Sequence, residues 1–224
     1  MDFIYLKFEL SFFTSKHFPM YHKYAFRLLM IGLLSGLFKL QAMAQSTPLA
    51  KGDKAPLFTA RACLAGKTFD FSLKNALEKG PVVLYFYPAA YTGGCDLEAH
   101  TFSELKDEFT KAGATIIGVS ADDIARLKSF SADPDYCAGK FPVASDPDGK
   151  IAARYGLKLI PPQPGVKDVR GEPVTHGFIP RTTFVIDARG NIIAVFSSET
   201  DHISPDQHAK MSLAIVKKLH PQQS

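Results

Sequence analysis

Runs of hydrophobic residues predict three strands near the start of the mature sequence. Every position of 82–87 is apolar, which is typical of a central strand buried on both faces of a sheet. Two shorter stretches, 58–63 and 67–73, have strand-like composition and are separated by Ala65-Gly66, a connection typical of a hairpin. The pattern therefore predicts an N-terminal β-hairpin followed by a buried strand.

The pattern then changes to alternating helices and strands. Apolar residues recur at helical spacing from Cys95 to about Gly113. Five prolines and three glycines between Leu157 and Pro180 indicate a long surface loop. Further helices are predicted at 122–130, 150–155 and 205–219, and further strands at 115–119, 141–144, 182–187 and 192–197. This order predicts an α/β protein of the thioredoxin-like fold, with three α/β/α layers, a mixed central sheet and the added hairpin.

Composition and charge narrow the classes of function. The 224 residues are 46% hydrophobic and 21% charged, which is ordinary for a globular protein. The net charge of +4 comes mostly from the first 44 residues, because 21 basic and 20 acidic residues follow them. No basic run follows, so we expect no nucleic-acid partner.

The first 44 residues have the organisation of a secretory signal peptide. Lys23 and Arg27 precede an apolar run of eleven residues at 28–38, and Ala42-Met43-Ala44 offers small residues at a cleavage site. The run is shorter than the roughly 20 residues of a membrane-spanning helix, so an uncleaved anchor is the less favoured alternative.

The predicted domains follow from this cleavage site. We expect a signal peptide at 1–44, with the true start at Met1 or Met20, and an exported domain at 45–224. The mature protein would be periplasmic or secreted, without stable membrane association.

Cys95 stands where a helix begins directly after a strand and a Pro/Gly-bearing turn. Free N–H groups and the helix dipole stabilise a thiolate at such a position. Cys95 is therefore a candidate reactive thiol, although free cysteines are more often inert core residues.

Four blocks of sequence stand out in order along the chain: GDKAPLF at 52–58, PAAYTGGC at 88–95, FPVASDPDG at 141–149 and RTTFVID at 181–187. Together they resemble the peroxiredoxin family, and most closely its bacterioferritin comigratory protein branch. The block at 88–95 matches the P-x-x-x-T-x-x-C active-site motif of that family. The resemblance covers about 48–220 and implies a thiol peroxidase of hydrogen peroxide and organic hydroperoxides.

The resemblance also implies a role for each matched residue. Cys95 would be the peroxidatic nucleophile, with its pKa lowered by the helix N-terminus and by Arg181. Thr92 would place its hydroxyl against the thiolate and the peroxide, and Pro88 would shield the thiolate. Glu98, one turn into the helix, would help to hold the arginine.

Cys137 is the candidate resolving thiol by the same resemblance. It precedes the FPVASDPDG block, and condensation with the Cys95 sulfenic acid would give an intramolecular disulfide that a thioredoxin-like donor reduces. His100 occupies the position of the resolving cysteine in another variant of this branch. Cys63 is expected to be an inert buried residue, with a structural Cys63–Cys137 disulfide as the alternative.

Other features set the remaining expectations. Asp96 follows the nucleophile where the family more often has a neutral residue, and repulsion would raise the pKa of Cys95. The histidines lack metal-ligand spacing and no nucleotide-binding loop occurs, so we predict neither metal nor cofactor.

The resemblance implies a monomer, with a dimer as the alternative. The competing function is a non-catalytic thioredoxin-fold binding or chaperone-like module with structural thiols.

Overall fold

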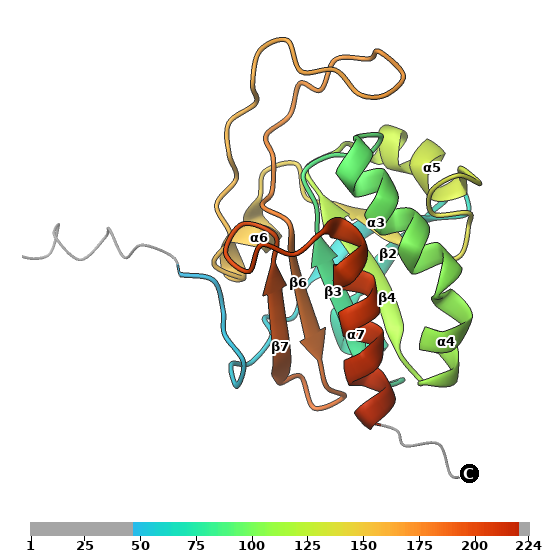
Figure 1. Cartoon of the computed structure of the whole chain (residues 1–224), viewed down its shortest axis with the longest axis vertical. Coiled ribbons are helices and arrows are strands. Elements are labelled where there is room, and N and C mark those ends of the chain that lie inside the picture. Colours follow the sequence, from blue (N-terminus) through green and yellow to red (C-terminus); the bar gives the residue numbers. More distant parts are fainter. Residues whose placement is uncertain (1–46, 220–224) are drawn as a thin grey trace, which may run out of the picture. The chain divides into compact units, whose positions relative to one another are not determined.

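A seven-stranded mixed sheet forms the centre of the protein, which a computed structural model describes for residues 47–219 (Figure 1). The strands are β1 (Thr59–Leu64), β2 (Lys67–Ser72), β3 (Val82–Phe86), β4 (Thr115–Ser120), β5 (Val143–Ser145), β6 (Thr182–Ile186) and β7 (Ile192–Ser197). Their order across the sheet is β2-β1-β5-β4-β3-β6-β7. Strand β3 pairs parallel to β4 and antiparallel to β6. The predicted mixed sheet is therefore confirmed.

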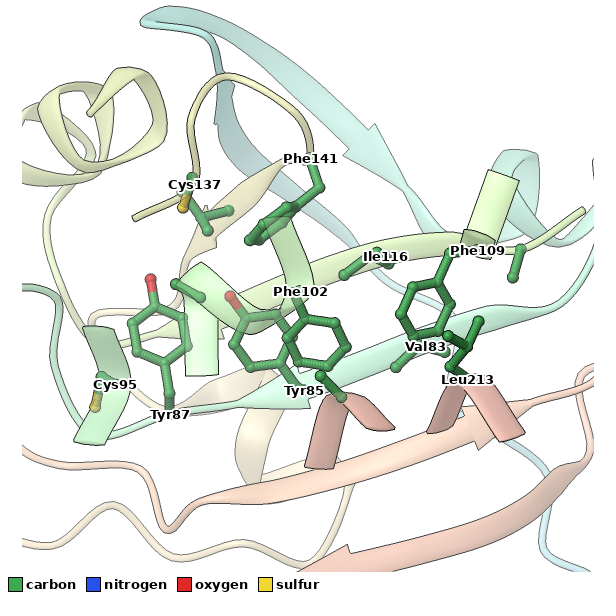
Figure 2. Close-up of a cluster of buried hydrophobic side chains, with 14 of the residues drawn as sticks. Val83, Tyr85, Tyr87, Cys95, Phe102, Phe109, Ile116, Cys137, Phe141 and Leu213 are labelled. Carbon is green, nitrogen blue, oxygen red and sulfur yellow. The ribbon is translucent and has the colours of Figure 1, made fainter. Parts of the chain in front are cut away.

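Helices cover both faces of this sheet, as the α/β/α prediction requires. Side chains of α3 (Gly93–Glu104), α4 (Lys106–Lys111), α5 (Ile124–Ala132) and α7 (Pro205–Leu219) pack in one core, part of which is drawn in Figure 2. Those of α2 (Leu73–Leu77) and α6 (Lys150–Arg154) pack in the other. Successive side chains of β3 alternate between the two cores, which explains why every position of this strand is apolar.

Figure 2 also shows aromatic side chains packed between β3 and α3. The ring of Tyr85 stacks on Phe102 of α3, with 4.6 Å between ring centroids. Tyr85 lies opposite Gly118 in the pairing of β3 with β4, and a Cβ atom at Gly118 would come within 2.6 Å of the tyrosine ring. The glycine thus provides the space that the ring occupies.

The predicted hairpin is an edge of the main sheet. Its turn residues, Ala65 and Gly66, have φ angles of 48° and 74°, the left-handed values that a tight two-residue hairpin requires. Strand β1 pairs antiparallel with β5 on its other side. The hairpin is therefore continuous with the sheet and does not form a separate unit.

One helical prediction was wrong in detail, and one short helix was missed. The helix expected from Cys95 to Gly113 is divided at Leu105 into α3 and α4. The hydroxyl of Thr101 donates to the carbonyl of Leu97 (2.7 Å), a local bond that often bends helices. The short helix α2 was not predicted, although Ser72 caps it by accepting from the backbone N–H of Asn75.

The predicted surface loop between α6 and β6 is confirmed, and it doubles back on itself (Figure 1, orange). Isolated bridges join Ile160 to Phe178 and Lys167 to Pro173. Gly156, which ends α6 with a φ of 75°, is the predicted residue after the helix cap.

The predicted signal peptide lies outside the described residues, together with both candidate starts and the alternative of an uncleaved anchor. Between residues 47 and 219, no helix has the length and apolar character needed to span a bilayer.

Candidate active site

Cys95 lies in the first turn of α3, at the end of a loop that leaves β3. The helix begins at Gly93 after the cap residue Thr92, and the N–H groups of Cys95 and Asp96 bond to the Thr92 carbonyl at 2.8 and 2.9 Å. The side chain of Cys95 is almost completely buried, since the residue is 2% exposed. The predicted strand–turn–helix thus places one thiol in the first turn of a helix, where the helix dipole favours a negative charge.

Arg181 reaches this thiol from the neighbouring strand. It directly precedes β6, whose first residue Thr182 pairs with Phe86 at the end of β3. Its Nη2 atom lies 3.2 Å from the Sγ atom of Cys95. Its Nη1 atom donates to the buried carboxylate of Glu98 on α3. The structure therefore brings together Cys95, Arg181 and Glu98, which stand far apart in the sequence.

The loop before the helix supplies the remaining predicted residues. The hydroxyl of Thr92 donates to the carbonyl of Ala89 (2.7 Å) and does not cap the helix. That hydroxyl and the backbone N–H of Ala89 both lower the pKa of Cys95. Pro88 lies half-buried in the same loop. Thr92 and Pro88 are thus in the loop that borders the thiol, as the motif predicts.

The predicted lowering of the Cys95 pKa was wrong in its net direction. Burial is the largest effect and raises the pKa of Cys95, although Arg181 opposes it as expected. Burial also raises the pKa of Glu98 to about 8, again against the effect of Arg181. Exclusion of water therefore outweighs the favourable charge in this closed site.

Asp96 acts on a different thiol from the one predicted. Its carboxylate raises the pKa of Cys137, after the larger effects of burial and Asp133, and does not figure among the dominant influences on Cys95. Burial raises the pKa of Asp96 itself to about 6. The expected repulsion is therefore directed at the candidate resolving cysteine.

All three cysteines are buried and free. Figure 2 shows the ring of Tyr87 between Cys95 and Cys137, both of which belong to the core on the α3 face. Neither the Cys95–Cys137 disulfide nor the alternative Cys63–Cys137 disulfide is formed in this conformation. The thiol of Cys63 lies 3.7 Å from the carbonyl of Ile124, a contact that fits the inert core residue predicted.

His208 of α7 lies behind Glu98 and was missed by sequence analysis. Its two ring nitrogens contact the hydroxyls of Thr183 and Ser198, each at 2.9 Å, and its Nδ1 lies 3.9 Å from the Glu98 carboxylate. Burial and Arg181 lower the pKa of His208 to about 4, so the ring is neutral at pH 7. A single histidine on an amphipathic helix carries no sequence signal for this placement.

His176 of the long loop is bound to Asp122. Its Nε2 atom lies 2.8 Å from the carboxylate of Asp122, and its Nδ1 atom contacts the carbonyl of Gly177. Among residues 47–219 no cluster of His, Cys, Asp and Glu side chains is suited to hold a metal ion. The site therefore consists of a buried thiol, a guanidinium and backbone donors, which together can polarise the O–O bond of a peroxide.

Comparisons with known proteins give a consistent set of similarities. A sequence model of the AhpC/TSA family matches residues 51–195. A provisionally named peroxiredoxin of Mycobacterium tuberculosis is 36% identical over 147 residues, which cover 66% of this chain and 84% of the relative.

Solved structures are similar over most of the described chain. Peroxidoxin BcpB of Mycobacterium tuberculosis aligns with a TM-score of 0.62 and 32% identity, covering 77% of this chain and 99% of that one. The bacterioferritin comigratory protein of Xanthomonas campestris aligns with a TM-score of 0.54 and 29% identity, covering 71% and 90%.

Proposed function

Since this chain belongs to the AhpC/TSA family of peroxiredoxins, we propose that it is an exported thiol peroxidase whose nucleophile is Cys95. Members of the family are peroxidases, which are oxidoreductases. Membership therefore favours an enzyme over the alternative of a non-catalytic binding or chaperone-like module. The 3.2 Å contact between Cys95 and Arg181 carries the assignment of the nucleophile.

In the first step the Cys95 thiolate attacks one oxygen of the peroxide and the O–O bond breaks. Cys95 becomes a sulfenic acid, and the leaving oxygen takes a proton to become water or an alcohol. Arg181 and the N–H groups at the start of α3 would stabilise the negative charge on that oxygen. Thr92 would orient the peroxide, Pro88 would exclude water, and Glu98 would hold Arg181 in place.

In the second step the Cys137 thiol condenses with the sulfenic acid, which gives a Cys95–Cys137 disulfide and water. Both residues are buried, so each segment must unwind locally before the sulfur atoms reach bonding distance. A thioredoxin-like dithiol would then reduce the disulfide and itself become oxidised. The substrates would be hydrogen peroxide and organic hydroperoxides, and alkyl peroxide reduction is the activity named for the Xanthomonas campestris structure.

Coupled turnover with thioredoxin, thioredoxin reductase and NADPH tests this assignment. Cys95→Ser should abolish peroxide consumption. Cys137→Ser should still consume one equivalent of peroxide but lose turnover with thioredoxin. Cys63→Ser, the matched control in the core, should turn over at the wild-type rate. Full turnover by Cys95→Ser would show that another residue is the nucleophile.

The export proposal rests on the organisation of residues 1–44. Expression of the full chain in a bacterial host should yield periplasmic protein whose N-terminus, read by mass spectrometry, is Gln45. Replacing the small residue Ala44 at the cleavage site by Phe should leave the leader attached. Uncleaved protein in the cytoplasm, starting at Met1 or Met20, would contradict export.

A further inference from the structure

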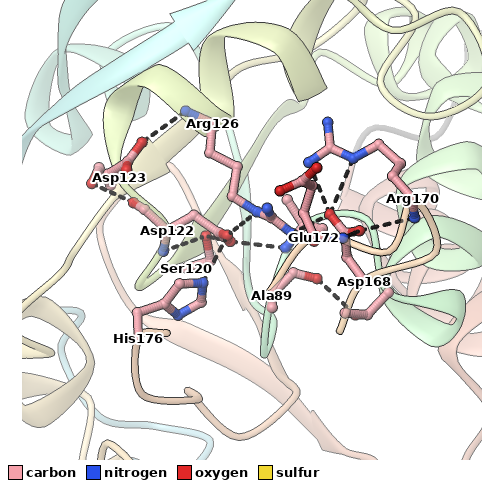
Figure 3. A network of polar contacts seen from close by, with 12 residues as sticks. Ala89, Ser120, Asp122, Asp123, Arg126, Asp168, Arg170, Glu172 and His176 are labelled. Atoms are coloured by element: carbon pink, nitrogen blue, oxygen red, sulfur yellow. Dashed lines mark hydrogen bonds and ion pairs between the residues drawn. The ribbon is translucent and has the colours of Figure 1, made fainter. Parts of the chain in front are cut away.

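Asp168 lies in the long loop between α6 and β6, and its side chain binds two arginines. Its Oδ2 atom accepts from the Nη2 atoms of Arg126 and Arg170, each at 2.8 Å, and the Asp168 side chain is fully buried. Figure 3 shows both arginines converging on this carboxylate, one from α5 and one from the loop itself. We call Asp168, Arg126 and Arg170 the Asp168 clamp.

The clamp and its neighbours bind the backbone of the active-site loop. Arg126 donates to the carbonyl of Ala90 (2.8 Å), and the N–H group of Ala90 donates to the carboxylate of Asp122 (2.8 Å). Val169, next to Asp168, donates its N–H group to the carbonyl of Tyr91 (2.9 Å). The long loop thereby contacts the segment that runs from Pro88 to Cys95.

Tyr91 is held in a conformation that its backbone disfavours. Its φ angle is 61°, in the left-handed region that residues with a Cβ atom rarely occupy. The guanidinium carbon of Arg170 lies 3.3 Å from the centroid of the Tyr91 ring, and that of Arg126 lies 5.4 Å away. These cation–π contacts and the bonds of the neighbouring backbone oppose the relaxation of Tyr91.

The same ring reaches the segment that contains Cys137. Tyr91 packs edge-on against Phe130 and Tyr136, with centroid distances of 5.1 and 5.4 Å. Tyr136 directly precedes Cys137, and all of these side chains contact one core. Tyr91 is part of the active-site loop and thus links both the clamp and that loop to the segment that contains Cys137.

We propose that the Asp168 clamp holds the active-site loop closed over Cys95, and that its release permits the opening that brings Cys95 to Cys137. Asp168 and Arg170 are positioning residues in this proposal, because they act through Tyr91 and touch neither thiol. The opening is a property of the reduced protein and does not require peroxidase activity. Its role in disulfide formation rests on the function proposed above.

Alkylation of the reduced, full-length protein tests the clamp without any peroxide. Both thiols are buried, so their reaction with iodoacetamide requires opening. Asp168→Asn keeps the shape of the side chain and removes its charge, and it should speed alkylation of Cys95 and Cys137 about tenfold. Arg170→Gln removes one of the two arginines and should have a smaller effect in the same direction.

Two controls separate local opening from general destabilisation. Cys63 is also buried but lies on β1, where its thiol contacts the carbonyl of Ile124 at the start of α5, so its alkylation rate should change less than those of Cys95 and Cys137. Asp70→Asn breaks the exposed ion pair with Arg61 and should alter none of the three rates. Equal acceleration at all three cysteines, or no acceleration at Cys95 and Cys137, would overturn the proposal.

Oxidation separates this proposal from the proposed function. With one equivalent of hydrogen peroxide, Asp168→Asn should convert sulfenic acid to disulfide faster than the wild type. With excess peroxide it should accumulate less sulfinic acid, because the disulfide forms before a second peroxide oxidises Cys95. If the wild type forms no Cys95–Cys137 disulfide, the proposed function fails while the alkylation rates still decide the clamp. A wild-type yield of sulfinic acid in Asp168→Asn would count against the clamp.

Discussion

At the scale of single residues, the site is governed by the opposition between burial and one positive charge. Burial raises the pKa values of Cys95 and Glu98, and the guanidinium of Arg181 lowers both. A thiolate is the form that attacks peroxide, so Arg181 and the adjacent N–H groups have to compensate for the exclusion of water. The predictions at this scale therefore concern Arg181 and its carboxylate partner.

Replacing Arg181 with Gln should slow the first reaction with hydrogen peroxide about 100-fold at pH 7. Loss of the charge should raise the pKa of Cys95 further, so the rate should reach its maximum at a higher pH than in the wild type. Rapid mixing, acid quench and mass spectrometry of Cys95 would measure both effects. Arg61→Gln, at an exposed ion pair, is the matched control, and equal rates in the two variants would contradict the role of Arg181.

Replacing Glu98 with Gln should change how stability depends on pH. The pKa of Glu98 in the folded protein, about 8, lies above its ordinary value, so the folded state binds the proton more tightly. The resulting stabilisation is complete below the ordinary pKa and is lost as the pH rises to about 8. The free energy of unfolding should therefore fall less in Glu98→Gln than in the wild type between about pH 5 and about pH 8.

Urea unfolding under reducing conditions at several pH values would measure this difference, at about 1.4 kcal/mol for each unit of pKa shift as an upper limit. Glu104→Gln is the control on the same helix, because its side chain is 65% exposed. Parallel curves for the wild type and Glu98→Gln would show that Glu98 is ionised throughout.

Motif spacing predicted which residues meet at the site but not how the site is tuned. Thr92, Cys95 and Glu98 lie within seven consecutive residues of the sequence, and the resemblance to the family identified Arg181 as their partner. The direction of the Cys95 pKa depends on how completely the packed core excludes water, which no local pattern contains. The same reason explains why Asp96 and His208 were misjudged or missed.

At the scale of elements, the start of α3 depends on two glycines with different surroundings. A Cβ atom on Gly94 would lie 3.2 Å from Nη2 of Arg181 and 3.3 Å from Pro205. A Cβ atom on Gly93 would meet nothing within 4 Å. Only at Gly94 is the absence of a side chain therefore required for the approach of Arg181 to the helix.

Gly94→Ala should displace the guanidinium and slow the reaction with peroxide about tenfold, since small misplacements at a reacting group are costly. Gly93→Ala should keep the rate and stabilise the protein by about 0.5 kcal/mol, because alanine loses less conformational entropy in a helix. Peroxide kinetics and urea unfolding of both variants would check this. Equal rates of reaction with peroxide in the two alanine variants would contradict a special role for Gly94.

The strands and the last helix, 205–219, were predicted from the sequence, whereas the division of the helix after Cys95 was not. The apolar runs of β3 and β6 mark buried strands directly, whereas no local pattern marks the break at Leu105, which follows the hydrogen bond from Thr101 to Leu97. The loop between Leu157 and Pro180 was predicted from its prolines and glycines. Its docking through Asp168 was not, because each partner of that carboxylate is an ordinary surface residue type in the sequence.

At the scale of the whole molecule, the sheet order creates the site. Strands β3 and β6 stand almost a hundred residues apart along the chain, and their antiparallel pairing brings Arg181 beside Cys95. The α/β order predicted this class of sheet, and the hairpin β1–β2 extends it at one edge. The signal peptide and the monomeric state stay predictions, which N-terminal mapping and sedimentation of the mature protein would check.

The central claim is that Cys95 is oxidised first and is then joined to Cys137. Its most direct test treats the reduced mature protein with one equivalent of hydrogen peroxide, alkylates the remaining thiols under denaturing conditions and maps them by mass spectrometry. We predict rapid loss of the Cys95 thiol and a Cys95–Cys137 disulfide, with Cys63 still alkylated. A free Cys95 thiol beside a Cys63–Cys137 disulfide would contradict the account.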